Sequence, residues 1–275
     1  MSENLDYWRR QSIKKLFNDI DLLPPEQKRM AGKLLVIGGN RMAFFAVASA
    51  LETAKRMGVG EVRALLPEDL KGQVPSTSEV YFAKSGNSGA FCADSLSEML
   101  RLADWAEAVI LIGDSGRNAE TSLVFAEFLE KVEKPVLITR DAVDAVCPSV
   151  GDWLTREAET DLFVTMPQLQ KLLRTLYYPK VITLSMPTNQ LVETLHKFTL
   201  SYETSVATFH NGLIVMAEKG EVVTQALDET SYSPISLWGG SLVTQAMVAR
   251  LWNSGKQFNH IFASVAAPGN EKGGR

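Results

Sequence analysis

The chain has 275 residues, of which 45% are hydrophobic and 22% are charged. These proportions are typical of a globular protein and exclude a collagen, a coiled coil and an intrinsically disordered chain. Lys and Arg number 28 against 32 Asp and Glu, a formal charge of −4. Because no basic excess is present to neutralise a phosphate backbone, we expect no nucleic-acid partner.

The longest apolar runs, such as 108–112 and 213–217, are far shorter than the roughly 18 residues of a membrane span. The first residues lack a basic region followed by an apolar one, so we expect a cytoplasmic protein with no membrane partner. Cys92 and Cys147 form no C-x-x-C pair, and we expect buried thiols rather than a zinc site. A disulfide between them stays open.

Residues 1–32 form an N-terminal segment in which apolar residues recur at spacings of three to five. This spacing predicts an amphipathic helix, which Pro24 and Pro25 would end. Such a helix would either cover its own domain or contact a neighbouring subunit. The apolar residues are Leu5, Trp8, Ile13, Leu16, Phe17 and Ile20.

From residue 33 onward, short apolar runs alternate with segments of helical period. This alternation predicts βαβ units and a mostly parallel sheet with helices on both faces. The first expected strand is the apolar run 33–40, which ends in glycines and enters a loop. The other expected strands are 62–66, 105–113, 135–139, 163–165 and 181–184, and the expected helices are 42–57, 121–131, 168–176 and 189–197. Residues 149–160 are polar and predict a loop or short helix.

The alternation of predicted strands and helices stops near the end of the chain. Three close strands are expected at 205–209, 212–218 and 221–226, and Lys219 and Gly220 predict a hairpin turn between the last two. A helix through 246–252 follows. We therefore expect one α/β domain over 33–267 and a flexible, glycine-rich tail over 268–275.

Ligands of such a sheet bind beyond the carboxyl ends of its strands. The loops there are 38–41, 113–116, 139–141 and the region of Thr165. The first, Gly-Gly-Asn-Arg, is neither a G-x-G-x-x-G fingerprint nor a P-loop. The three histidines share no metal-ligand spacing, so no metal site is expected.

Gly239, Gly240 and Ser241 precede the last predicted helix. Free backbone N–H groups and the helix dipole would favour an anion there, although a simple serine N-cap gives the same pattern.

The order of these segments resembles that of the bacterial ADP- or ATP-dependent NAD(P)H-hydrate dehydratases, which have a ribokinase-like fold. The resemblance rests on 34–39, 58–60, 109–116, 135–142, the hairpin at 211–222 and the glycines at 239–240. It implies a ribokinase-like α/β fold with a late β-hairpin, ADP or ATP as cofactor and hydrated NAD(P)H as substrate.

Matching the family's motifs to this chain implies a set of contact residues. Substrate contacts would come from Ala46, Asp114 and Ser115. Nucleotide contacts would come from His210, Asn211, Gly212, Gly239, Gly240 and Ser241. Relatives of this fold often self-associate, so the resemblance also implies a homodimer or homotetramer.

The chain departs from the family at several of these motifs. Phe45 replaces a glycine, Thr139-Arg140-Asp141 keeps only the second Asp of Asp-Ala-Asp, and the histidine of a loop placed here at 165–168 is missing. Val243 stands where the family has its catalytic Asp. No Asp or Glu lies between Thr230 and Asn270 to replace it.

A general acid or base contributes about a hundred- to ten-thousand-fold in rate. We therefore expect a divergent protein that binds an adenine nucleotide or an NAD(P)-type ligand, with weak or no dehydratase activity. One alternative is an active dehydratase whose acid or base has moved to Asp114 or Asp141. Another is a non-catalytic structural or regulatory oligomer.

Overall fold

The computed structural model describes residues 6–12, 15–75, 77–227 and 238–267. Its strands are β1 (Trp8–Gln11), β2 (Lys33–Gly38), β3 (Glu61–Pro67), β4 (Val80–Ala83), β5 (Ala108–Gly113), β6 (Val136–Thr139), β7 (Thr160–Val164), β8 (Thr204–His210), β9 (Leu213–Glu218) and β10 (Glu221–Ala226). Its helices are α1 (Phe45–Met57), α2 (Leu96–Trp105), α3 (Ala119–Lys131), α4 (Asp141–Val146), α5 (Val150–Trp153), α6 (Met166–Thr175), α7 (Thr188–Ser201), α9 (Ser241–Trp252) and α10 (Phe258–Ala266).

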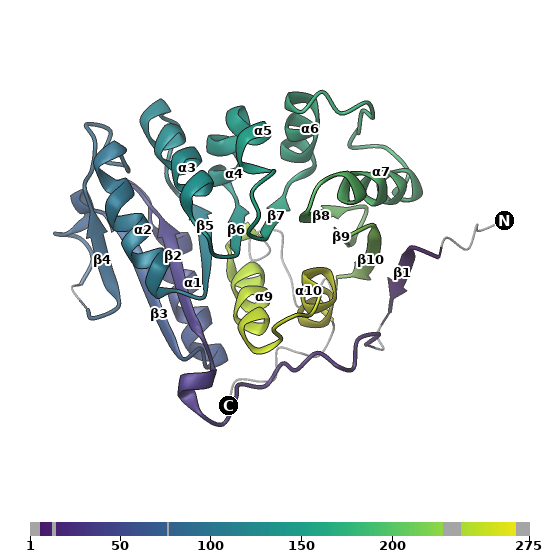
Figure 1. The fold of residues 1–275 in the computed structure, drawn as a ribbon, viewed down its shortest axis with the longest axis horizontal. Coiled ribbons are helices and arrows are strands. Elements are labelled where there is room, and N and C mark those ends of the chain that lie inside the picture. Colours follow the sequence, from purple (N-terminus) through teal and green to yellow (C-terminus); the bar gives the residue numbers. More distant parts are fainter. Residues whose placement is uncertain (1–5, 13–14, 76, 228–237, 268–275) are drawn as a thin grey trace.

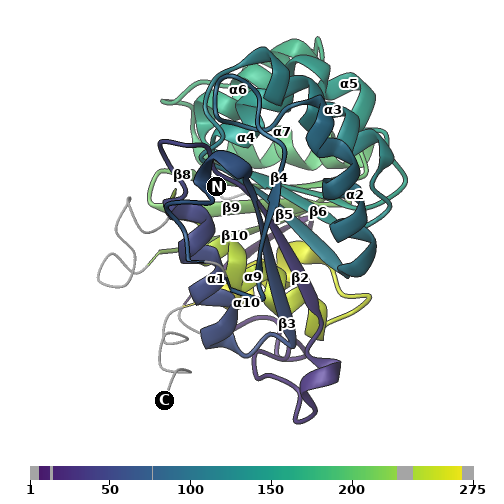
Figure 2. The same cartoon turned by 90° about the vertical axis from the view of Figure 1, so that its left-hand side faces the viewer.

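All of these strands join one sheet, in the order β1-β10-β9-β8-β7-β6-β5-β2-β3-β4. Every pairing is parallel except β8 with β9 and β9 with β10. The sheet is therefore mostly parallel with a late antiparallel hairpin, which confirms the predicted fold class. Helices α2 to α7 cover one face and α1, α9 and α10 cover the other (Figures 1 and 2).

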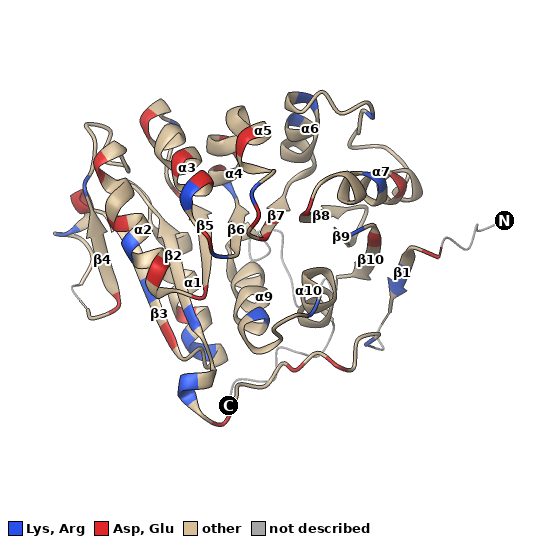
Figure 3. Cartoon of the chain, viewed as in Figure 1, with Lys and Arg blue, Asp and Glu red and all other residues tan. Residues whose placement is uncertain are grey.

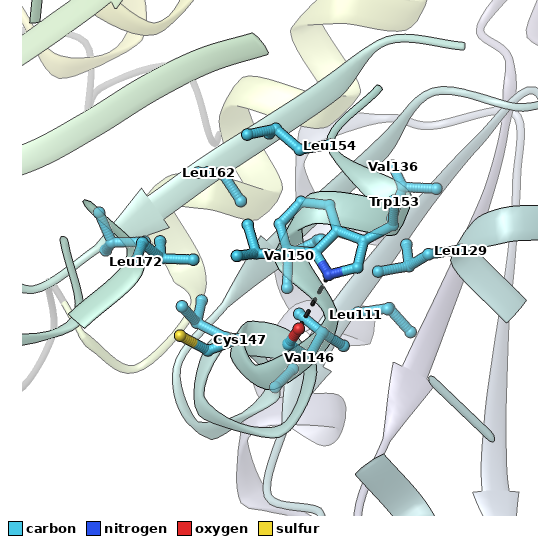
Figure 4. Close-up of a cluster of buried hydrophobic side chains, with 14 of the residues drawn as sticks. Leu111, Leu129, Val136, Val146, Cys147, Val150, Trp153, Leu154, Leu162 and Leu172 are labelled. Carbon is cyan, nitrogen blue, oxygen red and sulfur yellow. Dashed lines mark hydrogen bonds between the residues drawn. The ribbon is translucent and has the colours of Figure 1, made fainter. Parts of the chain in front are cut away.

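The strands are buried on both faces, because successive side chains point to opposite helical layers. In β2, Leu35 and Ile37 pack in the α2–α7 layer, whereas Leu34 and Val36 pack against α1 and α9. Figure 4 shows the centre of the α2–α7 layer, where Trp153 is fully buried and its indole N–H donates to the Val146 carbonyl at 2.8 Å. Both cysteines are free and buried.

The predicted N-terminal helix is wrong. Trp8–Gln11 forms β1, which pairs in parallel with β10 at one end of the sheet (Figure 1). The apolar spacing of this segment drifts from the helical period, and the exposed edge of β10 offers hydrogen bonds to an extended chain. Phe17 and Ile20 are still buried, but without a helix around them.

The strand predicted over 181–184 is also wrong. Val181 and Leu184 are 74% and 68% exposed, and the segment is an irregular connection between α6 and α7. The place beside β7 that a further parallel strand would take is filled by β8. The predicted tail over 268–275 lies outside the described residues.

Among the described residues, no helix combines the length and the apolar character that crossing a bilayer requires.

Candidate functional site

Loops that the sequence assigns to the carboxyl edge of the sheet contact one another in the structure. The backbone N–H of Gly39, after β2, donates to the Gly113 carbonyl at the end of β5, at 2.8 Å. The Asn40 amide donates to the Asp114 carbonyl at 2.5 Å. The ends of β2 and β5 are thus fixed together where a doubly wound sheet binds its ligands.

Asp114 is held at the centre of this edge. Its backbone adopts a left-handed conformation with φ 56°. One carboxylate oxygen accepts the backbone N–H of Ala46, at the start of α1, at 2.7 Å, and the other pairs with the Arg140 guanidinium. Ala46 and Asp114 therefore lie together, as the predicted substrate contacts require, but Ala46 takes part through its backbone and its side chain is fully buried.

Arg140 is a residue of this edge to which sequence reasoning assigned no role. It follows β6 directly and has φ 57° and ψ −140°, a conformation that is strained for any residue except glycine. Its guanidinium bridges the Asp114 carboxylate and the Trp238 carbonyl, which it reaches at 2.5 Å. The only signal in the sequence was its position immediately after a buried strand.

Asp141 binds the loop that follows β5. Its carboxylate accepts backbone N–H groups from Asp114 at 2.6 Å and from Ser115 and Gly116 at 3.0 Å each. Successive amides of this kind form an anion-binding nest, and here an internal carboxylate fills it. The predicted substrate contact Ser115 is fully buried, and its hydroxyl has no hydrogen-bond partner among the described residues.

The start of α9 packs against the end of β5 and against α1. Gly240 has φ 95°, and a Cβ at this position would lie 2.7 Å from the Cδ1 of Ile112, so both the backbone and the packing favour glycine. The Ser241 hydroxyl is 3.3 Å from that of Thr53 in α1. The ring of Trp238 stacks on Phe163, with centroids 4.7 Å apart.

Val243 and its neighbour Leu242 are fully buried, in the apolar cluster between α9 and the sheet. The position to which the resemblance assigns an acid therefore faces an apolar core. No titratable group replaces it in the described part of α9's first turn.

His210, Asn211 and Gly212 lie at the end of β8. They are at the same edge of the sheet as Asp114 but are separated from β5 by β6 and β7. The imidazole Nε2 of His210 is buried, 2.8 Å from the Met186 carbonyl oxygen. Asn211 and Gly212 have φ values of 49° and 77° and form the tight turn into β9.

Within the described residues, no group of three or more His, Cys, Asp or Glu side chains is placed to hold a metal ion. Lys and Arg residues are interspersed with Asp and Glu over both helical layers rather than gathered on one element (Figure 3).

No family model matches the sequence. Two curated relatives are each named as a bifunctional NAD(P)H-hydrate repair enzyme. The one from Methanothermobacter thermautotrophicus is 31% identical over 123 residues, which is 44% of this chain and 24% of the relative. The one from Dictyoglomus turgidum is 31% identical over 147 residues, 50% of this chain and 28% of the relative. The matches thus span about a quarter of the length of these relatives.

Solved structures with the same fold cover most of the chain. A ribokinase-like superfamily protein from Enterococcus faecalis superposes with a TM-score of 0.69 at 12% identity, over 95% of this chain and 86% of the other. The chain has the ribokinase-like fold, and up to half of it is similar in sequence to the NAD(P)H-hydrate repair enzymes. The predicted resemblance is therefore confirmed.

A second similar solved structure is that of the ADP/ATP-dependent NAD(P)H-hydrate dehydratase from Bacillus subtilis, co-crystallised with ATP and Mg²⁺. It superposes with a TM-score of 0.57 at 14% identity, over 89% of this chain and 82% of that one. At this identity the likeness concerns the fold alone, and the ligand belongs to that protein.

Proposed function

We propose that this ribokinase-like protein binds an adenine nucleotide or an NAD(P)-type dinucleotide at the carboxyl edge of its sheet and has weak or no NAD(P)H-hydrate dehydratase activity. The observation that carries the loss of activity is the burial of Val243 in an apolar cluster. Dehydration needs a group that moves a proton near the reacting atoms, and a valine side chain in the core supplies none.

The two carboxylates at the edge are poorly suited to replace the missing acid. Asp114 is bound by the Ala46 N–H and by Arg140, and Asp141 accepts three backbone N–H groups. Each would have to break these contacts to reach a ligand. The structure therefore favours the proposed loss of activity over an active dehydratase with a relocated acid.

Binding of the ligand is supported by the placement of the implied contacts. The turn at 210–212 and the start of α9 lie at the same edge of the sheet, and the unpaired N–H groups at the start of a helix attract anions. A nucleotide that crosses this edge would place its phosphates beside Gly239 and Ser241. ADP, ATP and NADPH are the ligands to test.

Thermal unfolding of the full chain with ADP, ATP, NADPH and adenosine tests binding. A ligand at a hundred times its Kd stabilises a protein by about 2.7 kcal/mol, so a clear rise in Tm is expected with the charged nucleotides. Ser241→Glu should abolish this rise, since it places a negative charge where the phosphates would lie. Ser201→Glu, at the exposed C-terminal end of α7, is the matched control. No rise with any nucleotide would refute the proposal.

The proposed loss of dehydratase activity is tested by measuring the disappearance of hydrated NADH with ADP present. We expect no rate above that of buffer. A rate abolished by Asp114→Asn or Asp141→Asn would overturn the proposed loss of activity and identify the relocated acid.

We further propose that the chain forms a dimer or tetramer. With β1 in place of a helix, the candidate contact is the outer edge of β1, where the sheet ends. A light-scattering mass equal to one chain would contradict self-association.

A further inference from the structure

A cavity of about 400 Å³ opens at the carboxyl edge of the sheet between α3, α4 and α6. The loop 116–118, the first turn of α3, part of α4 and Lys171 of α6 line it. This volume is within the range of pockets for small molecules. Neither the turn at 210–212 nor the start of α9 contributes to the lining, so the cavity is separate from the proposed nucleotide contacts.

The two acidic side chains of the lining are already satisfied within the protein. Asp141 accepts the three backbone N–H groups of the loop after β5. Asp144 accepts from the Gln168 amide at 2.9 Å and from the Lys171 ammonium at 3.2 Å. Their oxygens are therefore engaged rather than turned to a ligand, and no metal-holding group of His, Cys, Asp or Glu occurs in the described part of the chain.

The basic side chains of the lining retain free donors. Arg117 is exposed and has neither a hydrogen bond nor an ion pair to any described residue. The Lys171 ammonium donates one hydrogen bond to Asp144 and has further N–H groups available. The Asn118 amide and the Ser122 hydroxyl, which are both in the lining, are engaged in capping α3. Unused donors in the cavity thus come mainly from two cations.

We propose that this cavity binds a small phosphorylated metabolite, with Arg117 and Lys171 holding its phosphate. A guanidinium presents paired N–H donors that fit two phosphate oxygens, and an ammonium adds a second charge-assisted hydrogen bond. The carboxylate oxygens of Asp141 and Asp144 already accept hydrogen bonds within the protein, so they are not free to coordinate a divalent cation. The site goes beyond the proposed nucleotide function, because Arg117 and Lys171 are not among the proposed nucleotide contacts and the ligand is a second one.

Isothermal titration calorimetry of the full chain at low ionic strength, with glycerol 3-phosphate and inorganic phosphate as probes, tests the site. Arg117→Gln and Lys171→Met should each weaken binding about tenfold, the effect of losing one charged hydrogen bond. The matched controls are Arg56→Gln and Lys131→Met, which remove exposed charges outside the cavity and should leave binding unchanged. Equal affinity in all four variants, or no binding by the wild type, overturns the proposal.

A steric variant gives a second readout that does not depend on charge. Ser122→Phe places a ring in the cavity and should abolish binding of the probe, whereas Leu123→Phe on the exposed side of α3 should not. Binding of glycerol that equals binding of glycerol 3-phosphate, or preferential binding of Mg²⁺, would show that the phosphate is not what the cavity recognises.

The same titrations separate this site from the proposed nucleotide site. Ser241→Glu should leave binding of glycerol 3-phosphate intact, and Arg117→Gln should leave any response to ADP intact. If Ser241→Glu loses binding of glycerol 3-phosphate and Arg117→Gln keeps it, the proposed phosphate site in the cavity is refuted and the nucleotide proposal is not. Absence of ADP binding with phosphate binding retained would refute the nucleotide proposal alone.

Discussion

The Arg140 guanidinium and the Asp114 carboxylate form an ion pair at the carboxyl edge of the sheet, between residues that are 26 positions apart in the chain. The same guanidinium holds the Trp238 carbonyl, and the same carboxylate holds the N–H of Ala46. One pair of side chains therefore ties together the loops after β5 and β6, the start of α1 and the approach to α9. Its geometry depends on a backbone conformation at Arg140 that most residues avoid.

Arg140→Ala and Arg140→Gly both remove the guanidinium, but only glycine relieves the strained backbone. We expect Arg140→Ala to lower the free energy of unfolding by about 1–3 kcal/mol, the cost of losing charged hydrogen bonds. Arg140→Gly should be less destabilising by roughly 1 kcal/mol, because φ 57° with ψ −140° suits glycine. Urea unfolding of both variants measures the difference, and a glycine variant weaker than the alanine variant would contradict this account.

Asp141→Asn should destabilise the protein by about 2–3 kcal/mol. An amide has one oxygen to accept hydrogen bonds and carries no charge, whereas the carboxylate accepts three backbone N–H groups. Asp144→Asn is the control from the same helix, since within the described residues the Asp144 carboxylate accepts hydrogen bonds only from the side chains of Gln168 and Lys171. A similar, small change in Tm for both variants would show that the loop does not depend on Asp141.

Restoring an acid at position 243 should disrupt the fold rather than create activity. Val243 is fully buried among apolar side chains, and an unpaired carboxylate there costs several kcal/mol. Val243→Ala removes only packing and should cost about 2 kcal/mol. Circular dichroism melts compare the two, and a well-folded Val243→Asp protein that dehydrates hydrated NADH would refute both the burial argument and the proposed function.

Glu218 gives the protein a specific pH dependence. Burial raises the pKa of this carboxyl from its ordinary value of 4.5 to about 7, and the nearby Asp161 carboxylate adds to the effect, whereas the Asn259 N–H, Arg250 and Lys219 oppose it. The folded protein therefore binds this proton more tightly than the unfolded chain does. The stability that the proton contributes is complete below pH 4.5 and is lost as the pH rises to about 7.

Glu218→Gln removes this titration and keeps an oxygen to accept the Asn259 N–H, which lies 3.0 Å away. Relative to the wild type, the variant should gain roughly 2–3 kcal/mol between pH 4.5 and pH 8, at about 1.4 kcal/mol per pKa unit. Denaturant unfolding at both pH values measures this gain. Glu52→Gln on the surface of α1 is the control, and an equal gain in that variant would contradict the role of burial.

Substitution of Gln11 tests whether the N-terminal strand β1 contributes to stability. Its side-chain amide donates to Gln225 and to the Ala263 carbonyl, both at 2.7 Å, and its oxygen accepts the Leu16 N–H at 2.9 Å. Gln11→Ala should cost about 2–3 kcal/mol, because it leaves buried groups unpaired. Arg10→Ala, on the neighbouring exposed residue, should cost less than about 1 kcal/mol. Equal small losses would argue against β1.

The sequence by itself determined the α/β alternation, the parallel core strands and the late hairpin. Runs such as 34–37 and 108–112 contain only apolar side chains, and a strand of that kind is stable only between two helical layers. The dipeptide Lys219–Gly220 marks the hairpin turn, since glycine readily adopts a positive φ such as the 80° of Gly220. Local sequence patterns were sufficient to predict secondary structure wherever the residues of one short segment determined its conformation.

Local patterns failed where a distant segment decided the outcome. The N-terminal segment becomes a strand because β10, more than 200 residues away, offers a free edge, and 181–184 stays irregular because β8 already occupies the place beside β7. The roles of Arg140 and Asp141, and the cavity beside Lys171, likewise exist only once β5, β6 and β7 end side by side. Hydrogen bonds and charges between remote residues depend on distances that tertiary packing alone sets, so only the folded structure reveals them.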